Sequence, residues 1–227
     1  MLSACRWLAL EVKYLDRARS FYEAFLDLDV RRQSNSEVAL AVGGSDLVLR
    51  RPGSVPRGGL HTHYAASVPA SEYDDWYDRL DQRFDLVEQT FGGARSLYFY
   101  DTAGNCVELG ERDTADSGVS GLFEIVFEVE DLDRARTFYT DLGFEVIDTD
   151  TDRPRVRLTT GAFDLELWEP QLGLADARGG VHVDIGVECA DPASTAEAVE
   201  AAALATEETK EGVRIRDPDG HYVKLVN

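Results

Sequence analysis

The sequence predicts an α+β protein built from four copies of one unit, in which a strand and a helix are followed by about three strands. An internal repeat is the first observation behind this prediction. Residues 11–22 align without a gap with residues 128–139, and nine of those twelve positions are identical. The chain is therefore a duplication, with its joint in the polar stretch Glu111 to Ser120. Gly/Pro-rich connectors, Arg51 to Gly59 and Pro170 to Gly180, divide each half again.

The connectors define units of residues 1–57, 58–113, 114–175 and 176–227, and two domains of residues 1–113 and 114–227. Each unit opens with an apolar strand, namely Leu8–Val12, His63–Val68, Leu122–Val129 and Val181–Val187. Amphipathic helices are predicted over residues 16–26, 71–84, 133–142 and 192–204. Asp191 and Pro192 suit the start of the last helix, because the carboxylate can cap free amides and proline fits the first helical position. Strands separated by turns complete each unit, as in Ser96–Tyr100 and Cys106–Gly110.

Composition excludes several classes of protein. The net charge of the 227 residues is −20, which makes nucleic acid an unsuitable partner. Only three of the 23 basic residues are lysines, and this acidic, lysine-poor surface favours a halophilic source, because molar salt screens the repulsion between carboxylates. No apolar run approaches the roughly 18 residues of a membrane span, and three scattered cysteines suggest a reducing compartment, so we expect a cytoplasmic protein without membrane contact.

The repeated segment Val129–Tyr139 with its first-half copy, the segment His63–Val68, and the turns Asp101–Asn105 and Asp217–His221 resemble the vicinal oxygen chelate superfamily. This superfamily includes glyoxalase I, fosfomycin-resistance transferases, extradiol dioxygenases and bleomycin-binding proteins. The resemblance implies that the units pair into two half-open mixed-sheet barrels, one from residues 1–113 and one from residues 114–227. It also implies a divalent metal inside a barrel and a small-molecule substrate or ligand.

Metal ligands in this superfamily come from the first and last strands of each unit. One ligand lies five residues before the valine that ends the first strand. Another is a glutamate in the strand after the Asp-Gly turn. The matching positions are Trp7, His63 and Glu108 in the first half, and Glu124, His182 and Lys224 in the second. Neither half therefore contains the complete set.

His63 and Glu108 are the predicted metal ligands of the first barrel. His61 lies two residues before His63 and is expected on the same face of the strand, where it could replace the ligand that Trp7 cannot supply. Two imidazoles and one carboxylate suit Fe(II), and also Mn(II) or Zn(II). Alternatively, His61 lies in a connector and points to solvent.

Three further residues are candidates for the pocket of the first barrel. Tyr98 occupies the place of a pocket tyrosine in similar transferases and is the candidate catalytic residue. Trp7 and Cys106 are candidate substrate contacts. The alternatives are that Trp7 is an apolar plug at the barrel mouth and that Cys106 is a small buried hydrophobic residue.

The second barrel is predicted to be degenerate. Strand alternation directs a charged set into its interior, namely Glu124, Glu166, His182, Arg214 and Lys224. Because the ammonium of Lys224 repels a divalent cation and can neutralise carboxylates, we expect an ion pair with Glu124 or Glu166 in place of a metal. The alternative is a cation at Glu124, Glu166 and His182, with Lys224 turned outward. His221 is expected in an exposed turn.

The resemblance favours a metal-dependent enzyme that acts on a small vicinally oxygenated substrate, in the manner of an extradiol dioxygenase, with the first barrel active. Glyoxalase-like isomerisation or thiol transfer is the alternative within the enzyme class. A metal-free binding protein of the bleomycin-resistance type is the rival outside it. Either a monomer or a homodimer is compatible with the sequence.

Overall fold

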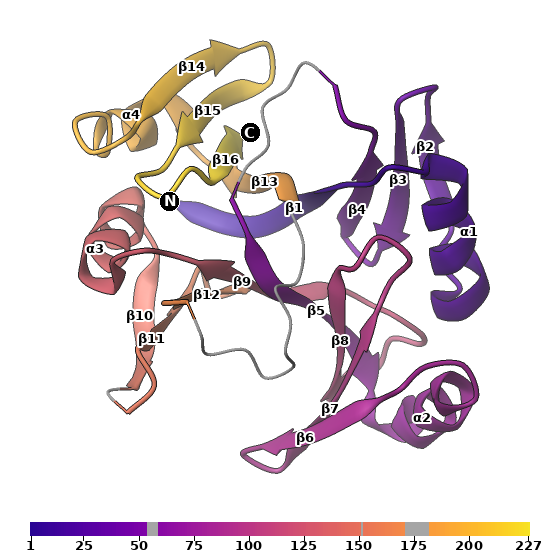
Figure 1. The fold of residues 1–227 in the computed structure, drawn as a ribbon. Coiled ribbons are helices and arrows are strands. Elements are labelled where there is room, and N and C mark those ends of the chain that lie inside the picture. The colour runs from indigo at the N-terminus through magenta and orange to yellow at the C-terminus, as the bar shows by residue number, and fades with distance from the viewer. Residues whose placement is uncertain (54–58, 151, 171–181) are drawn as a thin grey trace.

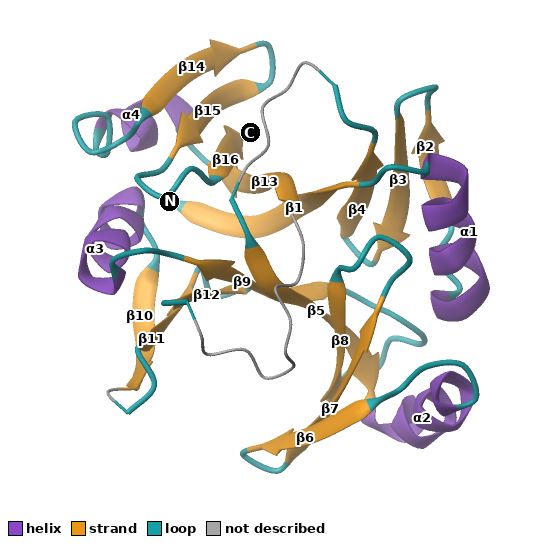
Figure 2. Ribbon diagram, viewed as in Figure 1, coloured by secondary structure: helices purple, strands orange, loops and turns teal. Residues whose placement is uncertain are grey.

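The computed structural model describes residues 1–53, 59–150, 152–170 and 182–227, and within these residues the strands form two mixed eight-stranded sheets. Figure 1 shows the two sheets at the centre of the molecule, and the helices lie around the outside, as the purple ribbons of Figure 2 make clear. The predicted α+β class and the four βαβββ units are confirmed.

The first half contains two units of the predicted order. The first comprises β1 (Leu2–Glu11), α1 (Leu15–Leu26), β2 (Val30–Gln33), β3 (Glu37–Val42) and β4 (Ser45–Arg50). The second comprises β5 (His61–Pro69), a 3₁₀ turn (Ala70–Glu72), α2 (Tyr73–Asp81), β6 (Val87–Phe91), β7 (Ala94–Tyr100) and β8 (Cys106–Arg112). Apolar faces of both helices are buried against the sheets, as the amphipathic pattern predicts.

The second half repeats this order. The third unit comprises β9 (Leu122–Glu128), α3 (Leu132–Leu142), β10 (Glu145–Asp150), β11 (Arg155–Thr159) and β12 (Asp164–Trp168). The fourth comprises β13 (His182–Cys189), α4 (Pro192–Glu197), β14 (Ala205–Thr209), β15 (Gly212–Arg216) and β16 (Tyr222–Val226). Asp191 caps α4 by accepting from the backbone N–H of Ser194, as expected, but the helix ends at Glu197, well before residue 204.

The prediction that consecutive units pair within one barrel is wrong. The strand order β14-β15-β16-β13-β1-β4-β3-β2 joins the first unit to the fourth, and β10-β11-β12-β9-β5-β8-β7-β6 joins the second to the third. The central pairs are antiparallel contacts between first strands, β1 with β13 and β5 with β9. A sequence repeat shows which units are alike, whereas the choice of sheet neighbour depends on which strand edges meet. We call these sheets the Trp7 sheet and the His63 sheet, respectively.

Consecutive units instead contact each other across the two sheets. The hydroxyl of Tyr22 in α1 donates to Asp101 in the turn before β8, at 2.7 Å, and Tyr139 in α3 donates to Asp217 in the corresponding turn before β16, at 2.8 Å. Both tyrosines belong to the repeated twelve-residue segment, and both are fully buried. The repeat therefore preserves a hydrogen bond that holds the two units of each half together.

His221 differs from its expected exposed position. Its ring is buried and stacks on Phe127, with 4.2 Å between ring centroids and 9° between planes. Its Nε2 lies 2.9 Å from the backbone oxygen of Glu128. The turn is thus packed between units rather than solvated. In the described part of the chain, none of the helices has the length and apolar character required to cross a bilayer.

Candidate functional site

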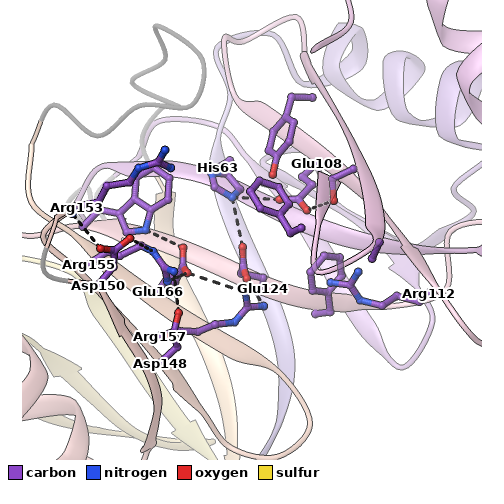
Figure 3. A pocket seen from close by; sticks show the side chains of 16 residues that line it. His63, Glu108, Arg112, Glu124, Asp148, Asp150, Arg153, Arg155, Arg157 and Glu166 are labelled. Atoms are coloured by element: carbon purple, nitrogen blue, oxygen red, sulfur yellow. Dashed lines mark hydrogen bonds and ion pairs between the residues drawn. The ribbon is translucent and has the colours of Figure 1, made fainter. Parts of the chain in front are cut away.

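A cavity of about 380 Å³ lies on the concave face of the His63 sheet. Its charged and polar lining comes from both paired units, with His63 on β5, Glu108 on β8, Glu124 on β9 and Glu166 on β12. These are the first and last strands of the second and third units. Figure 3 shows His63, Glu108 and Glu124 directed toward one another. We call these four residues the His63 site.

Three side chains of the His63 site converge on one point. The Nε2 atom of His63 lies 3.2 Å from Oε2 of Glu108 and 3.4 Å from Oε1 of Glu124. One ligand atom from each of the three residues lies within 4.8 Å of the others, and all three side chains are buried. The structure thus brings His63 and Glu108 together, as predicted, and adds a residue that the sequence assigned to another barrel.

Glu166 is the fourth residue of the His63 site. Its Oε1 accepts from Arg155 at 2.8 Å, and its Oε2 accepts from the indole N–H of Trp168 at 2.7 Å. Burial and the neighbouring charge of Glu124 raise the pKa of Glu166 to about 7, against a smaller lowering by Arg155. A carboxyl group with such a pKa can exchange a proton near neutral pH.

The other ionisable groups of the site hold opposite charges. Burial alone would lower the pKa of His63, but the adjacent carboxylates of Glu108 and Glu124 favour the charged imidazolium and raise it to about 10. His63 lowers the pKa of Glu108 despite the opposing effect of burial, and Ser96 assists by donating to Oε1 of Glu108 at 2.7 Å. Arg157 forms an ion pair with Glu124. Without another cation, an imidazolium and two arginines therefore balance the carboxylates.

The residues fit a divalent cation. Imidazole nitrogen and carboxylate oxygen are ligands for Mn²⁺, Fe²⁺ and Zn²⁺, and a set richer in oxygen suits Mn²⁺ best. Oε2 of Glu108 is buried, and within the described residues it accepts no well-aligned hydrogen bond, although it faces His63. A buried carboxylate oxygen without such a donor is an available metal ligand.

Tyr98 lies on β7 opposite Glu108 and lines the same cavity, as predicted. Its ring meets that of His63 edge to face, with 5.4 Å between centroids. Burial and the charge of Glu108 raise the pKa of Tyr98 well above its ordinary value. The phenol is therefore a neutral donor toward a ligand rather than a base.

His61 and Cys106 are not among the residues that line this cavity. A register shift between His61 and His63 interrupts the alternation of β5, so the two imidazoles do not share a face. The ring of His61 lies 6.3 Å from Tyr64, and Glu124 takes the place proposed for His61 as third ligand. Cys106 is buried at the start of β8, where burial raises the pKa of its thiol to about 12.

The charged interior predicted for the second half is divided between the sheets. Glu124 and Glu166 belong to the His63 sheet, whereas Lys224 lies on β16 of the Trp7 sheet. The prediction of an ion pair between Lys224 and Glu124 or Glu166 is therefore wrong, and Lys224 pairs with Glu211. Arg214 pairs with Glu207 on the neighbouring strand β14. His182 begins β13 of the Trp7 sheet, and its side chain lies outside the described residues.

The Trp7 sheet contains a different set of residues at the matching positions. Glu108 lies opposite Ala65, two residues after His63, and Lys224 lies opposite Gly186, two residues after Asp184. The position of His63 is thus matched by Asp184 rather than by His182. The other two positions hold Trp7 and Val48. The indole of Trp7 donates to Asp184 at 2.6 Å and packs on Ala9, Ala39 and Val48, so Trp7 does not line the cavity that contains His63 and Tyr98.

Four arginines line the cavity and were not anticipated, namely Arg112 on β8 and three that lie close together in the sequence. Arg153, Arg155 and Arg157 precede or lie on β11 and line the cavity together with Asp148 and Asp150. Their spacing of two residues places them on one face of an extended chain, and this signal was available in the sequence. No sequence signal, however, would have directed that face toward His63.

Comparison with known proteins agrees with the fold. Residues 5–109 match the sequence profile of the Glyoxalase/Bleomycin resistance protein/Dioxygenase superfamily, and residues 122–154 match that of the Bleomycin resistance protein-like N-terminal family. The metallothiol transferase FosB of Staphylococcus haemolyticus is 24% identical over 116 residues, which cover 48% of this chain and 84% of FosB.

Solved structures show the same arrangement over the full chain. Glyoxalase I from Zea mays superposes with a TM-score of 0.75 at 19% identity, covering 99% of this chain and 92% of the maize chain. A protein of Bacillus subtilis described as a candidate dioxygenase gives 0.76 at 13% identity, over 99% and 85% of the two chains. Residues 5–109 therefore carry a domain of the glyoxalase/bleomycin resistance/dioxygenase, or vicinal oxygen chelate, superfamily, and the chain as a whole shares the fold of glyoxalase I.

Proposed function

We propose that this protein is a metal-dependent enzyme whose active site is the cavity of the His63 sheet, acting on a small vicinally oxygenated substrate. The observation that carries the proposal is the convergence of His63, Glu108 and Glu124, with ligand atoms within 4.8 Å of one another in a buried position. These three residues would hold the cation, with Glu166 beside them. A bound divalent cation supplies Lewis acidity to substrate oxygens.

The protein's own side chains suit proton transfer next to such a centre. Glu166, with a pKa of about 7, can accept a proton from a substrate carbon or hydroxyl and return it. Arg155 and Trp168 hold its two oxygens in place. Tyr98 lines the same cavity and can donate a hydrogen bond to a substrate oxygen.

This donor set favours isomerisation, addition or thiol transfer over oxygen activation. The dioxygenase hypothesis depended on two imidazoles from His61 and His63, and His61 does not line the cavity. One imidazole with several carboxylates differs from the two-histidine facial triad of non-haem Fe(II) oxygenases. Similarity to FosB, a metallothiol transferase, supports the same choice.

Metal-free ligand binding is the second candidate function. Protonated His63, Arg155 and Arg157 can balance the carboxylates without a metal, and the similarity of residues 122–154 to a bleomycin resistance family supports it.

Metal analysis of protein purified without chelator separates the two functions. We expect about one equivalent of a divalent metal in the parent protein, much less in His63→Ala and Glu108→Gln, and parent-like content in Lys224→Ala as the matched control. Titration of the metal-free protein with Mn²⁺, Zn²⁺ and Fe²⁺ would rank the cations. Failure of all three to bind would reject the enzyme and leave the binding protein.

A further inference from the structure

A second cavity lies on the Trp7 sheet, at the position that corresponds to the His63 site. Its volume is about 1070 Å³, and its lining includes Trp7 and Lys224. We infer that this cavity is a metal-independent binding site for a small, multiply charged oxyanion, of the phosphate or polycarboxylate class. The proposal is separate from the activity proposed for the His63 sheet.

Charge distribution is the first argument. The chain has 43 acidic and 23 basic side chains, so a typical surface region should be strongly negative. The lining of this cavity is the reverse, with seven basic side chains against the four carboxylates of Glu37, Asp46, Asp184 and Glu211. Nearly a third of the lysines and arginines of the molecule therefore face one concavity. Such a focused positive potential attracts anions and increases their local concentration.

Two carboxylates of the cavity, Asp46 and Glu37, each accept hydrogen bonds from two arginines. Asp46 accepts from Arg31 at 2.6 Å and from Arg32 at 3.1 Å, and Glu37 accepts from Arg32 at 2.9 Å and Arg50 at 2.7 Å. These contacts hold the guanidinium groups in position. Each guanidinium carries five N–H donors, so some of these donors remain available to a ligand.

Two further cations have no carboxylate partner within the described residues. Arg6 on β1 and Lys210 in the turn between β14 and β15 line the cavity from two different units, and no ion pair to either is present in that part of the chain. An oxyanion bound in the cavity would offer a negative partner to such cations. Both side chains are exposed, so a ligand can reach them.

The floor of the cavity is built to exclude a metal rather than hold one. Trp7 occupies the position of Glu124, and its indole packs over Gly186, where a β-carbon would lie 2.3 Å from the ring. Only glycine at residue 186 permits this placement. The ammonium of Lys224, at the position of Glu108, lies 5.7 Å from the centre of the indole ring. A cation-binding set has thus been replaced by an aromatic floor with an ammonium beside it.

The fluorescence of Trp7 provides the direct test. Pyrophosphate and citrate, titrated separately at constant ionic strength, represent the phosphate and polycarboxylate sources. We expect at least one of them to change the fluorescence of Trp7 in a saturable way at millimolar concentration or below. The anion that binds more tightly identifies the ligand class. The signal should be lost in Trp7→Phe and retained in Trp76→Phe, and calorimetry should give the same affinity independently of the fluorophore.

Charge variants locate the binding. Lys224→Gln and Lys210→Gln should each weaken binding, by about tenfold for the loss of one close charge. Arg153→Gln, which removes a cation from the cavity of the His63 sheet, should leave the affinity unchanged. Glu108→Gln should reduce metal content without affecting the anion, so failure of this site is distinguishable from failure of the proposed enzyme. Parent-like affinity in both lysine variants, or no response to either anion beyond that of KCl, would overturn the inference.

Discussion

The two sheets of this protein share one architecture and differ in four side chains at matching positions. The His63 sheet has His63, Glu108, Glu124 and Glu166, whereas the Trp7 sheet has Asp184, Lys224, Trp7 and Val48. In the first set, His63, Glu108 and Glu124 converge on a buried point, whereas the second set contains an indole that donates to a carboxylate and has an ammonium beside it. The same sheet architecture can thus present either a cation site or a cation-lined cavity, because the side chains at these four strand positions differ.

The largest expected effect is a difference in metal affinity between matched variants of the two sheets. Glu124→Gln should weaken binding of Mn²⁺ or Zn²⁺ by at least about 100-fold, because it removes a directly contacting carboxylate where outer partners alone are worth 10- to 100-fold. Asp184→Asn, the matched change in the Trp7 sheet, should leave metal affinity unaltered. Calorimetric titration of the metal-free proteins measures both. Equal losses in the two variants would show that the sheets are not functionally distinct.

The pH dependence of stability should report the buried charges of the His63 sheet in metal-free protein. Raised folded pKa values, about 10 for His63 and about 7 for Glu166, mean that the folded state binds more protons than the unfolded state. The stabilisation from His63 is complete below its unfolded pKa of about 6.5 and disappears as pH rises through 10, and that from Glu166 disappears between about 4.5 and 7.

Urea unfolding of metal-free protein from pH 5 to 10 tests this expectation. The free energy of unfolding should fall across the range by more than about 1.4 kcal/mol, the equivalent of one pKa unit. His63→Gln should flatten the decrease above pH 6.5, and the matched variant Lys224→Gln should not. A parent protein whose stability rises over that interval would contradict the assignment of an imidazolium to the site.

The hydrogen bonds that Tyr22 and Tyr139 donate between consecutive units should both stabilise the fold. Tyr22→Phe and Tyr139→Phe each leave a buried aspartate, Asp101 or Asp217, without one donor, which costs about 1–3 kcal/mol. Thermal or urea unfolding measures the two losses side by side. Tyr22 also contacts the hydroxyl of Tyr64 at 2.8 Å, so its loss should be the larger. A Tyr139→Phe variant as stable as the parent would show that the hydrogen bond between Tyr139 and Asp217 does not stabilise the fold.

Salt should affect the acidic surface more than the buried charges. If the net charge of −20 is an adaptation to high ionic strength, the thermal midpoint should rise by several degrees between dilute and molar KCl, because screening relieves repulsion in the folded state. Differential scanning calorimetry at pH 7 measures the change. A flat or falling midpoint would count against a halophilic source, and His63→Gln should retain the salt response because its charge is buried.

The smallest expected effect concerns Lys224. Its partner Glu211 is 73% exposed, so the ion pair is a surface interaction, and Lys224→Ala should cost only about 0–1 kcal/mol. Had Lys224 balanced Glu124 or Glu166 in a buried interior, the cost would be about 3–5 kcal/mol. Chemical unfolding at pH 7 distinguishes the two ranges. A loss of about 3–5 kcal/mol would contradict the assignment of Glu211 as the partner of Lys224.

Much of the secondary structure could be predicted because its signals are local. The repeated segment marks α1 and α3, and Asp191 with Pro192 marks the start of α4. His63, Glu108 and Tyr98 were found as pocket residues because they occupy motif positions on strands of one unit. His61 was misplaced because a register shift in β5 breaks the alternation on which its prediction depended.

The sequence by itself determined the repeated unit, the superfamily resemblance and the residue type at each candidate ligand position. Only the tertiary structure decided which units share a sheet, and this choice moved Glu124 and Glu166 from a supposed salt-bridge interior with Lys224 to the side of His63. The physical reason is that strand pairing between units joins residues about 60 positions apart in one sheet and more than 170 apart in the other. Local patterns encode each strand's faces but not the edge it meets, so complementary edges in the folded chain select the partners.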